Sequence, residues 1–92
     1  MHDSLFRALA DPTRRRILEL LAERDRTAGE IAGEFPVAFA SVSHHLGVLK
    51  AAGLVAAERE GQFIRYRLNT TVFQEVMRYF MARFSGGGGN DA

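Results

Sequence analysis

Residues 41–55 read SVSHHLGVLKAAGLV, and this stretch decides the fold. Its larger side chains recur with helical spacing and share one face, which we expect to pack inward: Val42, His45, Leu46 and Leu49. The opposite face carries small or polar side chains: Ala40, Ser43, His44 and Gly47. Gly53 ends the helix, because glycine adopts a left-handed backbone without penalty, and a strand begins at Leu54. A helix with so thin an outer face can approach the floor of a DNA groove.

The composition describes one small globular domain. The chain has 92 residues, of which 47% are hydrophobic and 25% charged, values typical of a folded domain. The net charge of +1 gives little support by itself to nucleic-acid binding, although the arginines cluster at 14–16 and again between 59 and 67. The absence of cysteine excludes disulfides and thiolate metal sites. No apolar run reaches membrane-spanning length and the first residues resemble no secretory signal, so we expect a cytoplasmic protein.

Three helices are expected before the central one. A short amphipathic helix covers residues 5–10. In the second helix, Asp11 is the cap and Pro12 is the first helical residue. Thr27 and Glu30 match a capping box for a third helix, which we expect to bury Ile31, Ala32 and Phe35 and to end at Pro36. Two short helices joined by a tight turn form a helix-turn-helix.

Two strands and a last helix are expected after the central helix. Residues 54–60 and 63–69 alternate as strands around a turn at Gly61-Gln62, giving a β-hairpin wing with one apolar and one mostly cationic face. The last helix follows a cap at residues 69–71, and its apolar stripe is wider than one thin core can bury, which favours self-pairing. We therefore expect a domain over residues 1–84 and a flexible glycine-rich tail over 85–92.

Several motifs occur together in a familiar order: LADPTRRRIL at 9–18, SHHL at 43–46, AGLV at 52–55 and EGQ at 60–62. Together they resemble the ArsR/SmtB family of small winged-helix repressors. Residues 69–76, NTTVFQEV, are similar to the SdpR-like branch of that family, which lacks a metal site. The resemblance implies a mainly α winged helix-turn-helix with a β-hairpin wing, in the order α-α-α-α-β-β-α.

The resemblance also implies a homodimer on a palindromic double-stranded DNA operator, with repression that includes autorepression. Its central helix would enter the major groove through Ala40, Ser41, Ser43 and His44. Its wing would reach the backbone or the adjacent minor groove near Arg59, Gln62 and Arg65. The first and last helices would form the dimer interface through Leu5, Phe6, Leu9, Phe73, Val76, Met77, Phe80, Met81 and Phe84.

Four positions need separate interpretation. Ala38 replaces the Ser or Thr that usually caps the central helix in the family, so that end lacks a side-chain cap. Phe39 replaces a common Gln, and two interpretations are open: it contacts a thymine methyl group or folds back on the core. His45 is expected to be a packed structural histidine. Arg14 is a candidate phosphate contact at the start of the second helix.

Other functions have weaker support. His44 and His45 are adjacent and cannot chelate a metal from one helix face, so neither metal sensing nor a cofactor is expected. No nucleophile with a nearby base, paired acids or nucleotide-binding glycine pattern indicates an enzyme. Two alternatives stay open, namely a winged-helix module that binds another protein and a sensor of the same family responding to an unknown small organic inducer.

Overall fold

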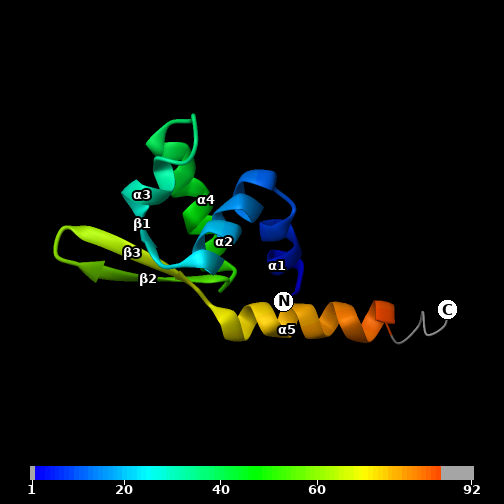
Figure 1. The fold of residues 1–92 in the computed structure, drawn as a ribbon. Helices are drawn as coiled ribbons and strands as arrows, with labels where there is room; N and C mark the ends of the chain where they lie inside the picture. The colour runs from blue at the N-terminus through cyan, green and yellow to red at the C-terminus, as the bar shows by residue number, and fades with distance from the viewer. Residues whose placement is uncertain (1, 86–92) are drawn as a thin grey trace.

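The computed structural model describes residues 2–85 (Figure 1). The elements follow in the order α1 (His2–Leu9), α2 (Pro12–Glu23), β1 (Arg26–Thr27), α3 (Ala28–Ala32), α4 (Phe39–Ala51), β2 (Val55–Glu60), β3 (Phe63–Leu68), α5 (Thr70–Phe80) and the π-helical turn η1 (Met81–Ser85). The expected mainly α fold with a β-hairpin wing is confirmed. The tail expected over 85–92 lies, apart from its first residue, outside the described residues.

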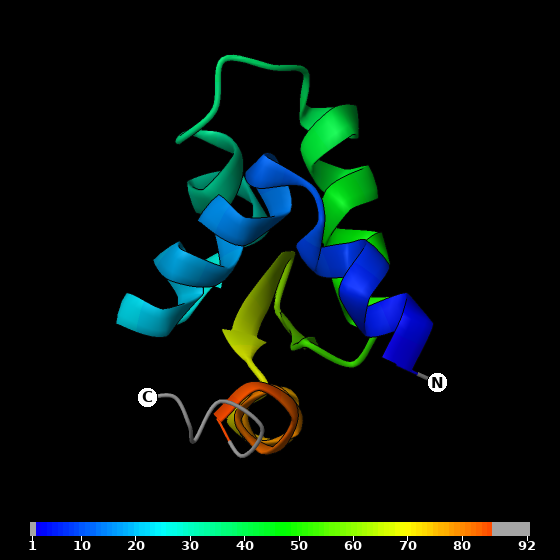
Figure 2. The same cartoon turned by 90° about the vertical axis from the view of Figure 1, so that its right-hand side faces the viewer.

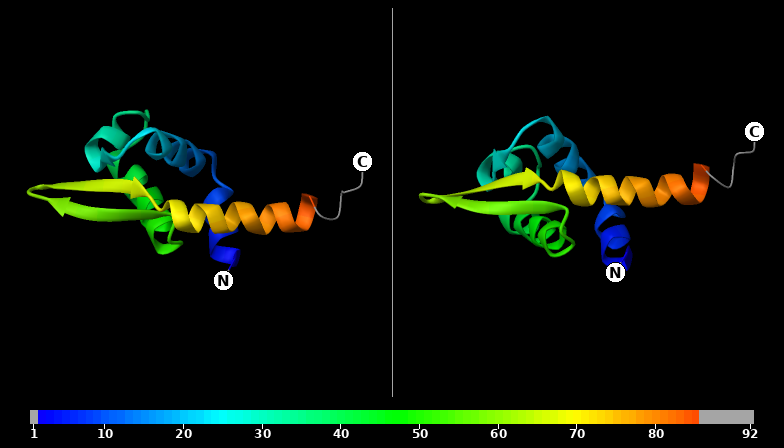
Figure 3. Two further views of the ribbon diagram at one scale, coloured as in Figure 1. Left: turned by 60° about the horizontal axis from the view of Figure 1, so that its bottom comes forward. Right: turned by 90° about the horizontal axis from the view of Figure 1, so that it is seen from below.

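The wing and α5 extend from opposite ends of the helical body (Figure 1). Viewed along its axis, α5 lies beneath the sheet and the other helices (Figure 2). Seen from below, it continues the line of the hairpin while α1 runs across it (Figure 3). The molecule is accordingly elongated, with principal extents of 51 × 24 × 24 Å. The helix α1 packs on the outer half of α5, where the ring centroid of Phe6 lies 5.4 Å from that of Phe80.

One apolar core joins α1, α2, α3 and α4 to the base of the hairpin and to α5. It consists of Leu5, Ala8, Ile17, Leu18, Leu21, Ile31, Val42, Leu46, Leu49, Leu54, Val55 and Val76. The inward stripe expected for α4 is confirmed, because Val42, Leu46 and Leu49 are fully buried. Gly53 has a φ of +80°, and the Leu54 N–H donates to the Leu49 carbonyl at 3.0 Å, so the helix ends as expected.

The helix caps expected from the sequence are present. The Asp11 carboxylate accepts from the Arg14 backbone N–H at 3.1 Å, with Pro12 at the first helical position of α2. Thr27 and Glu30 form the reciprocal capping box of α3. Asn69 Oδ1 accepts from the Val72 N–H at the start of α5. These side chains satisfy amides that would otherwise lack partners at the helix ends.

One local expectation was wrong, and one strand was not predicted. The third helix ends at Ala32 rather than at Pro36, because the chain turns at Gly33, and Phe35 lies half-buried in the loop. The missed strand lies directly before α3. Arg26 and Thr27 form β1, which pairs antiparallel with β3 and gives a three-stranded sheet in the order β1-β3-β2. The sequence gives no signal for this strand, because two residues are too few to show the alternation of apolar and polar side chains.

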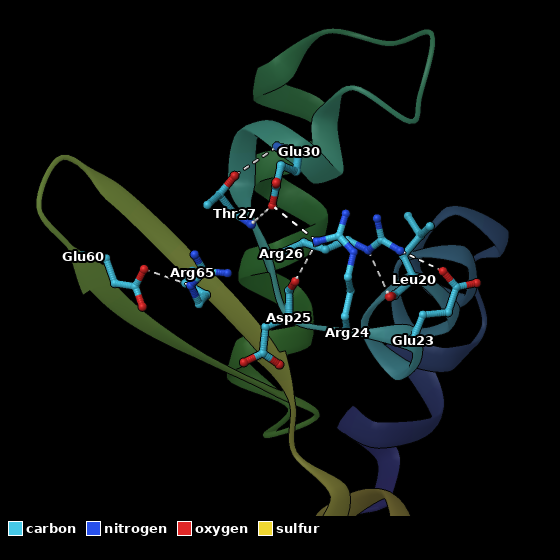
Figure 4. Close-up of polar contacts among 9 residues, drawn as sticks. All are labelled: Leu20, Glu23, Arg24, Asp25, Arg26, Thr27, Glu30, Glu60 and Arg65. Atoms are coloured by element: carbon cyan, nitrogen blue, oxygen red, sulfur yellow. Dashed lines mark hydrogen bonds and ion pairs between the residues drawn. The ribbon is translucent and has the colours of Figure 1, made fainter.

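The Arg26 side chain explains why this short strand lies where it does. It is buried, and its Nε donates to the Leu20 carbonyl at 3.0 Å, near the end of α2. Its Nη2 lies 2.7 Å from Glu23 Oε1 (Figure 4). A guanidinium placed at the carbonyl end of a helix satisfies free acceptors and opposes the negative end of the dipole. Arg26 thereby joins the end of α2 to the sheet.

Replacing Asp11 with Ala should lower the thermal unfolding midpoint by several degrees at neutral pH, because α2 loses its cap. The hydrogen bond from the Arg14 N–H lowers the pKa of Asp11 below 3.8. Its stabilisation is therefore present above 3.8 and is lost as the pH falls through the lower pKa of the folded chain.

Circular dichroism melts from neutral to strongly acid pH measure this difference, with the exposed Asp25→Ala as control. A gap between wild type and Asp11→Ala that stays constant into strong acid would contradict the assignment.

Candidate nucleic-acid interface

The outward face of α4 is small, polar and free of the core. Ala40, Ser41, Ser43, His44 and Gly47 are all exposed, whereas the opposite side of the helix is buried. A side chain at Gly47 would meet nothing within 4 Å, so the surface there is open. As expected, Ala38 provides no side-chain cap, and the first-turn amides of α4 lack that partner. The face therefore presents hydroxyl and imidazole groups at the surface, with small residues around them.

Phe39 lies at the first position of α4, and its ring is 56% exposed. It does not fold back into the core, which decides against one of the two interpretations left open by the sequence. With Ser43 it forms the α4 wall of a groove of about 330 Å³. The remaining walls come from the start of α3 and from the wing, through Thr27, Ala28, Gly29, Gln62, Phe63, Ile64 and Tyr66.

His45 faces inward at the junction of three helices. Its side chain is 17% exposed, and Nδ1 lies 3.1 Å from Arg14 Nη1 and 3.9 Å from Asp11 Oδ2. Its ring centroid is 5.8 Å from that of His44 on the outward side. The expectation of a packed structural histidine is confirmed. Because the Arg14 guanidinium can only donate, Nδ1 of His45 is the acceptor in this contact.

Arg14 does not present a free guanidinium to a phosphate. Its Nε donates to the Ala8 carbonyl at 2.8 Å, its Nη2 to the Arg7 carbonyl at 2.9 Å, and its Nη1 contacts His45. These contacts hold the carbonyl end of α1 against α4. A phosphate contact by Arg14 stays a prediction. The negative end of the α1 dipole offsets the positive charge of Arg14.

The two following arginines are also engaged. Arg15 Nη1 donates to the Leu9 carbonyl at 2.8 Å, so a second guanidinium closes the end of α1. Arg16 pairs with Glu19 at 3.1 Å on the exposed side of α2. The three adjacent arginines thus point in different directions, as expected from 100° per residue along a helix.

The wing carries the remaining predicted contact residues. Arg59 and Gln62 are exposed near the hairpin turn, where Gly61 has a φ of +63°, and Arg59 Nη1 donates to the Gly61 carbonyl. Arg65 Nε lies 2.9 Å from Glu60 Oε1 (Figure 4), and this hydrogen bond raises the pKa of the Arg65 guanidinium. Arg67 lies 3.6 Å from Glu58. The face expected to be mostly cationic is thus balanced by carboxylates from the opposite strand.

The structure brings the outward face of α4 and the inner side of the wing to opposite walls of one groove. Sequence reasoning had not assigned Phe63 and Ile64 to a site, although both are exposed and line this groove. The alternation of side chains along β3 does not predict this arrangement. It places Phe63 and Ile64 on opposite faces of the strand, and it does not indicate where the hairpin lies relative to α4.

The residues predicted for a dimer interface separate into three groups by burial. Leu5 and Val76 are buried inside this chain and so lie behind any contact surface, while Phe6, Leu9, Phe73 and Phe80 are half-buried. Phe6 packs on Phe80 with ring centroids 5.4 Å apart. Along the outer half of α5 and its continuation, Met77 is 45%, Met81 60% and Phe84 68% exposed. We name these last three residues the α5 apolar face.

Among residues 2–85, no group of three or more histidine, cysteine or acidic residues is placed to hold a metal ion. No helix among these residues has both the length and the apolar character needed to cross a membrane.

Comparison with known proteins gives consistent results. The family described as "Bacterial regulatory protein, arsR family" matches residues 11–57. The transcriptional repressor SdpR of Bacillus subtilis (strain 168) is 48% identical over 89 residues, covering 97% of this chain and 98% of that protein. The HTH-type transcriptional regulator CmtR of Mycobacterium bovis is 45% identical over 64 residues, 70% of this chain but only 54% of CmtR. An ArsR-like transcriptional regulator from Rhodococcus sp. RHA1 superposes with a TM-score of 0.84 at 33% identity, covering 92% and 78% of the two chains.

Replacing Arg14 with Ala should reduce the free energy of unfolding by about 2 kcal/mol, since hydrogen bonds from a charged group to two helix carbonyls and to His45 are lost. Arg14→Lys should recover only part of this loss, because an ammonium cannot reproduce the guanidinium fork. Arg16→Ala removes an exposed ion pair from the same helix and should change stability by less than about 1 kcal/mol.

Chemical denaturation of the three variants provides the comparison. If Arg14→Ala and Arg16→Ala proved equally stable, the structural role assigned to Arg14 would be wrong.

Proposed function

The chain belongs to the arsR family of bacterial regulatory proteins, and from this we propose that it is a transcriptional repressor that binds a palindromic operator as a homodimer. The relatives and the family are transcription regulators, a class without enzymatic activity. The observation that carries the proposal is the outward face of α4, where small and polar residues are exposed on a helix whose other side is fully buried.

In this proposal α4 enters the major groove and reads base edges. The hydroxyls of Ser41 and Ser43 and the imidazole of His44 supply the hydrogen bonds, and Ala40 and Gly47 keep the helix close to the groove floor. The buried residues behind them fix the position of the helix against the body. A rigid backing of this kind lets short side chains act at defined positions on the DNA.

The wing contributes contacts to the DNA backbone or the minor groove through Arg59, Gln62 and Arg65. Arg65 and Arg67 exchange their carboxylate partners on the hairpin for phosphates when DNA is bound. Since an exposed ion pair stabilises by only about 0.2–1 kcal/mol, this exchange costs little. Phosphate contacts of this kind release counterions, so affinity falls as salt is added.

Self-association is supported by the α5 apolar face. Met77 of α5 and Met81 and Phe84 of η1 are exposed and follow one another at helical spacing. The half-buried Phe80, next to Met81 in sequence, packs on Phe6. A second copy of the chain buries this surface and pairs two α4 helices. In a dimer of this kind the two recognition helices lie about 34 Å apart, one turn of DNA, which requires an operator with two related halves.

Repression follows when the bound dimer occupies promoter DNA, including that of its own gene. The site of action is then the cytoplasm, where bacterial DNA is transcribed. The partners in this proposal are DNA and a second copy of the chain, and whether a small organic inducer acts on the repressor is a separate question.

Replacing His44 with Ala should weaken binding to DNA from the region upstream of the chain's own gene by about tenfold or more, because a base-edge contact is lost. Ser43→Ala should act in the same direction. Fluorescence anisotropy against this duplex and a random duplex of equal length measures both affinities. Gln74→Ala, an exposed polar change on α5, should bind as the wild type does.

Wild-type binding that does not distinguish the upstream duplex from the random one, with no change in the His44 and Ser43 variants, would reject operator recognition. It would favour the alternative of a winged-helix module that binds another protein.

Replacing Met77 with Asp should shift the chain from dimer to monomer, because a carboxylate buried without a partner in an apolar interface is costly. We expect at least tenfold weaker self-association, which amounts to about 1.4 kcal/mol. Sedimentation velocity over a range of concentrations measures the change, and Ala82→Asp places the same charge at an exposed position outside the apolar stripe. An intact Met77→Asp dimer would remove the α5 apolar face from the interface.

A further inference from the structure

We propose that Phe39 selects thymine in each operator half-site by contacting its 5-methyl group in the major groove. This inference rests on the proposed function, since it concerns a base read by the same helix. It adds an apolar contact to the hydrogen bonds assigned to Ser43 and His44. It therefore makes a specific statement about the DNA sequence that this chain prefers.

The position of Phe39 supports a contact outside the protein. The ring lies on the first turn of α4 and is 56% exposed, while the core behind the helix is filled by Val42, Leu46 and Leu49. Phe39 and Ser43 are four residues apart, so they lie on the same side of the helix, and both line the groove that separates α4 from the wing. Phe39 thus extends the reading face toward the wing.

The chemistry of the ring limits what it can recognise. A phenyl group forms no conventional hydrogen bond, so it cannot distinguish the donors and acceptors that base pairs present in the major groove. The 5-methyl group of thymine is the apolar group on those base edges, and aromatic side chains are known to contact it. An exposed ring buries apolar area against that methyl and gains free energy only where thymine is present.

Apolar surface continues across the groove from Phe39. Phe63 and Ile64 of the wing are 59% and 38% exposed and line the opposite wall. Along α4, residues 39 and 43 are separated by a rise of about 6 Å, so the selected thymine should lie close to the base read by Ser43.

The test begins with a duplex selected from a random library by binding to the full wild-type chain. Each thymine of one half-site is then replaced by deoxyuridine, which removes only the methyl group. We expect the substitution at one of these thymines to lower the affinity of the wild-type chain about fourfold, which is the effect of losing one buried methyl-sized group. Phe39→Ala should bind the two duplexes equally, whereas Phe39→Leu should retain part of the difference.

Ser43→Ala is the matched control on the DNA-reading face. It should bind more weakly to both duplexes and keep the fourfold difference between them, because its lost contact is independent of the methyl group. Circular dichroism melts show whether each variant is folded, and exposed Phe39 should tolerate substitution.

The possible failures are distinguishable. Specific wild-type binding that is insensitive to deoxyuridine at every position, or a sensitivity that persists in Phe39→Ala, would overturn the inference and leave the repressor proposal standing. A wild-type chain that enriches no sequence from the library would overturn the proposed function itself, and the role of Phe39 with it.

Discussion

The structure depends on the position of one guanidinium. Arg14 lies in the first turn of α2, donates to the Ala8 and Arg7 carbonyls at the end of α1, and contacts His45 on the inner side of α4. Asp11, which caps α2, lies beside the same imidazole. One side chain therefore joins three helices where the apolar core alone would fix only their approximate packing. The residue next to His45, His44, is held outward as a consequence.

The same use of arginine recurs and explains how a nearly neutral chain can read DNA. Arg15 closes the end of α1 and Arg26 the end of α2, while Arg65 and Arg67 have carboxylate partners on the wing. Much of the positive charge thus stabilises helix ends and strands in the free protein. In the proposed complex, discrimination among DNA sequences would rest on the hydroxyl, imidazole and phenyl groups of α4, and the wing would supply charge when phosphates replace its carboxylates.

Sequence analysis predicted those features that have a local signal. The apolar spacing of α4, the caps at Asp11, Thr27 and Asn69, and the hairpin turn were all placed correctly, because each is determined by neighbouring residues. The roles of Arg14 and Arg26 were missed, since their acceptors are backbone carbonyls six residues away whose direction depends on how helices pack. The groove between α4 and the wing was missed for the same reason: it forms between segments about 20 residues apart, and periodicity says nothing about their separation.

In the proposed dimer, a second copy of the chain, joined through α1 and α5, holds two α4 helices one DNA turn apart. The chain has no cysteine, so Gly47→Cys, at an open position on the outward face of α4, accepts a single spin label per chain. Double electron–electron resonance on the DNA-free protein then measures the distance between the two recognition helices. The account predicts one narrow distribution centred near 34 Å, broadened by the label. Absence of dipolar coupling, or a distance far from one helical turn of DNA, would contradict it.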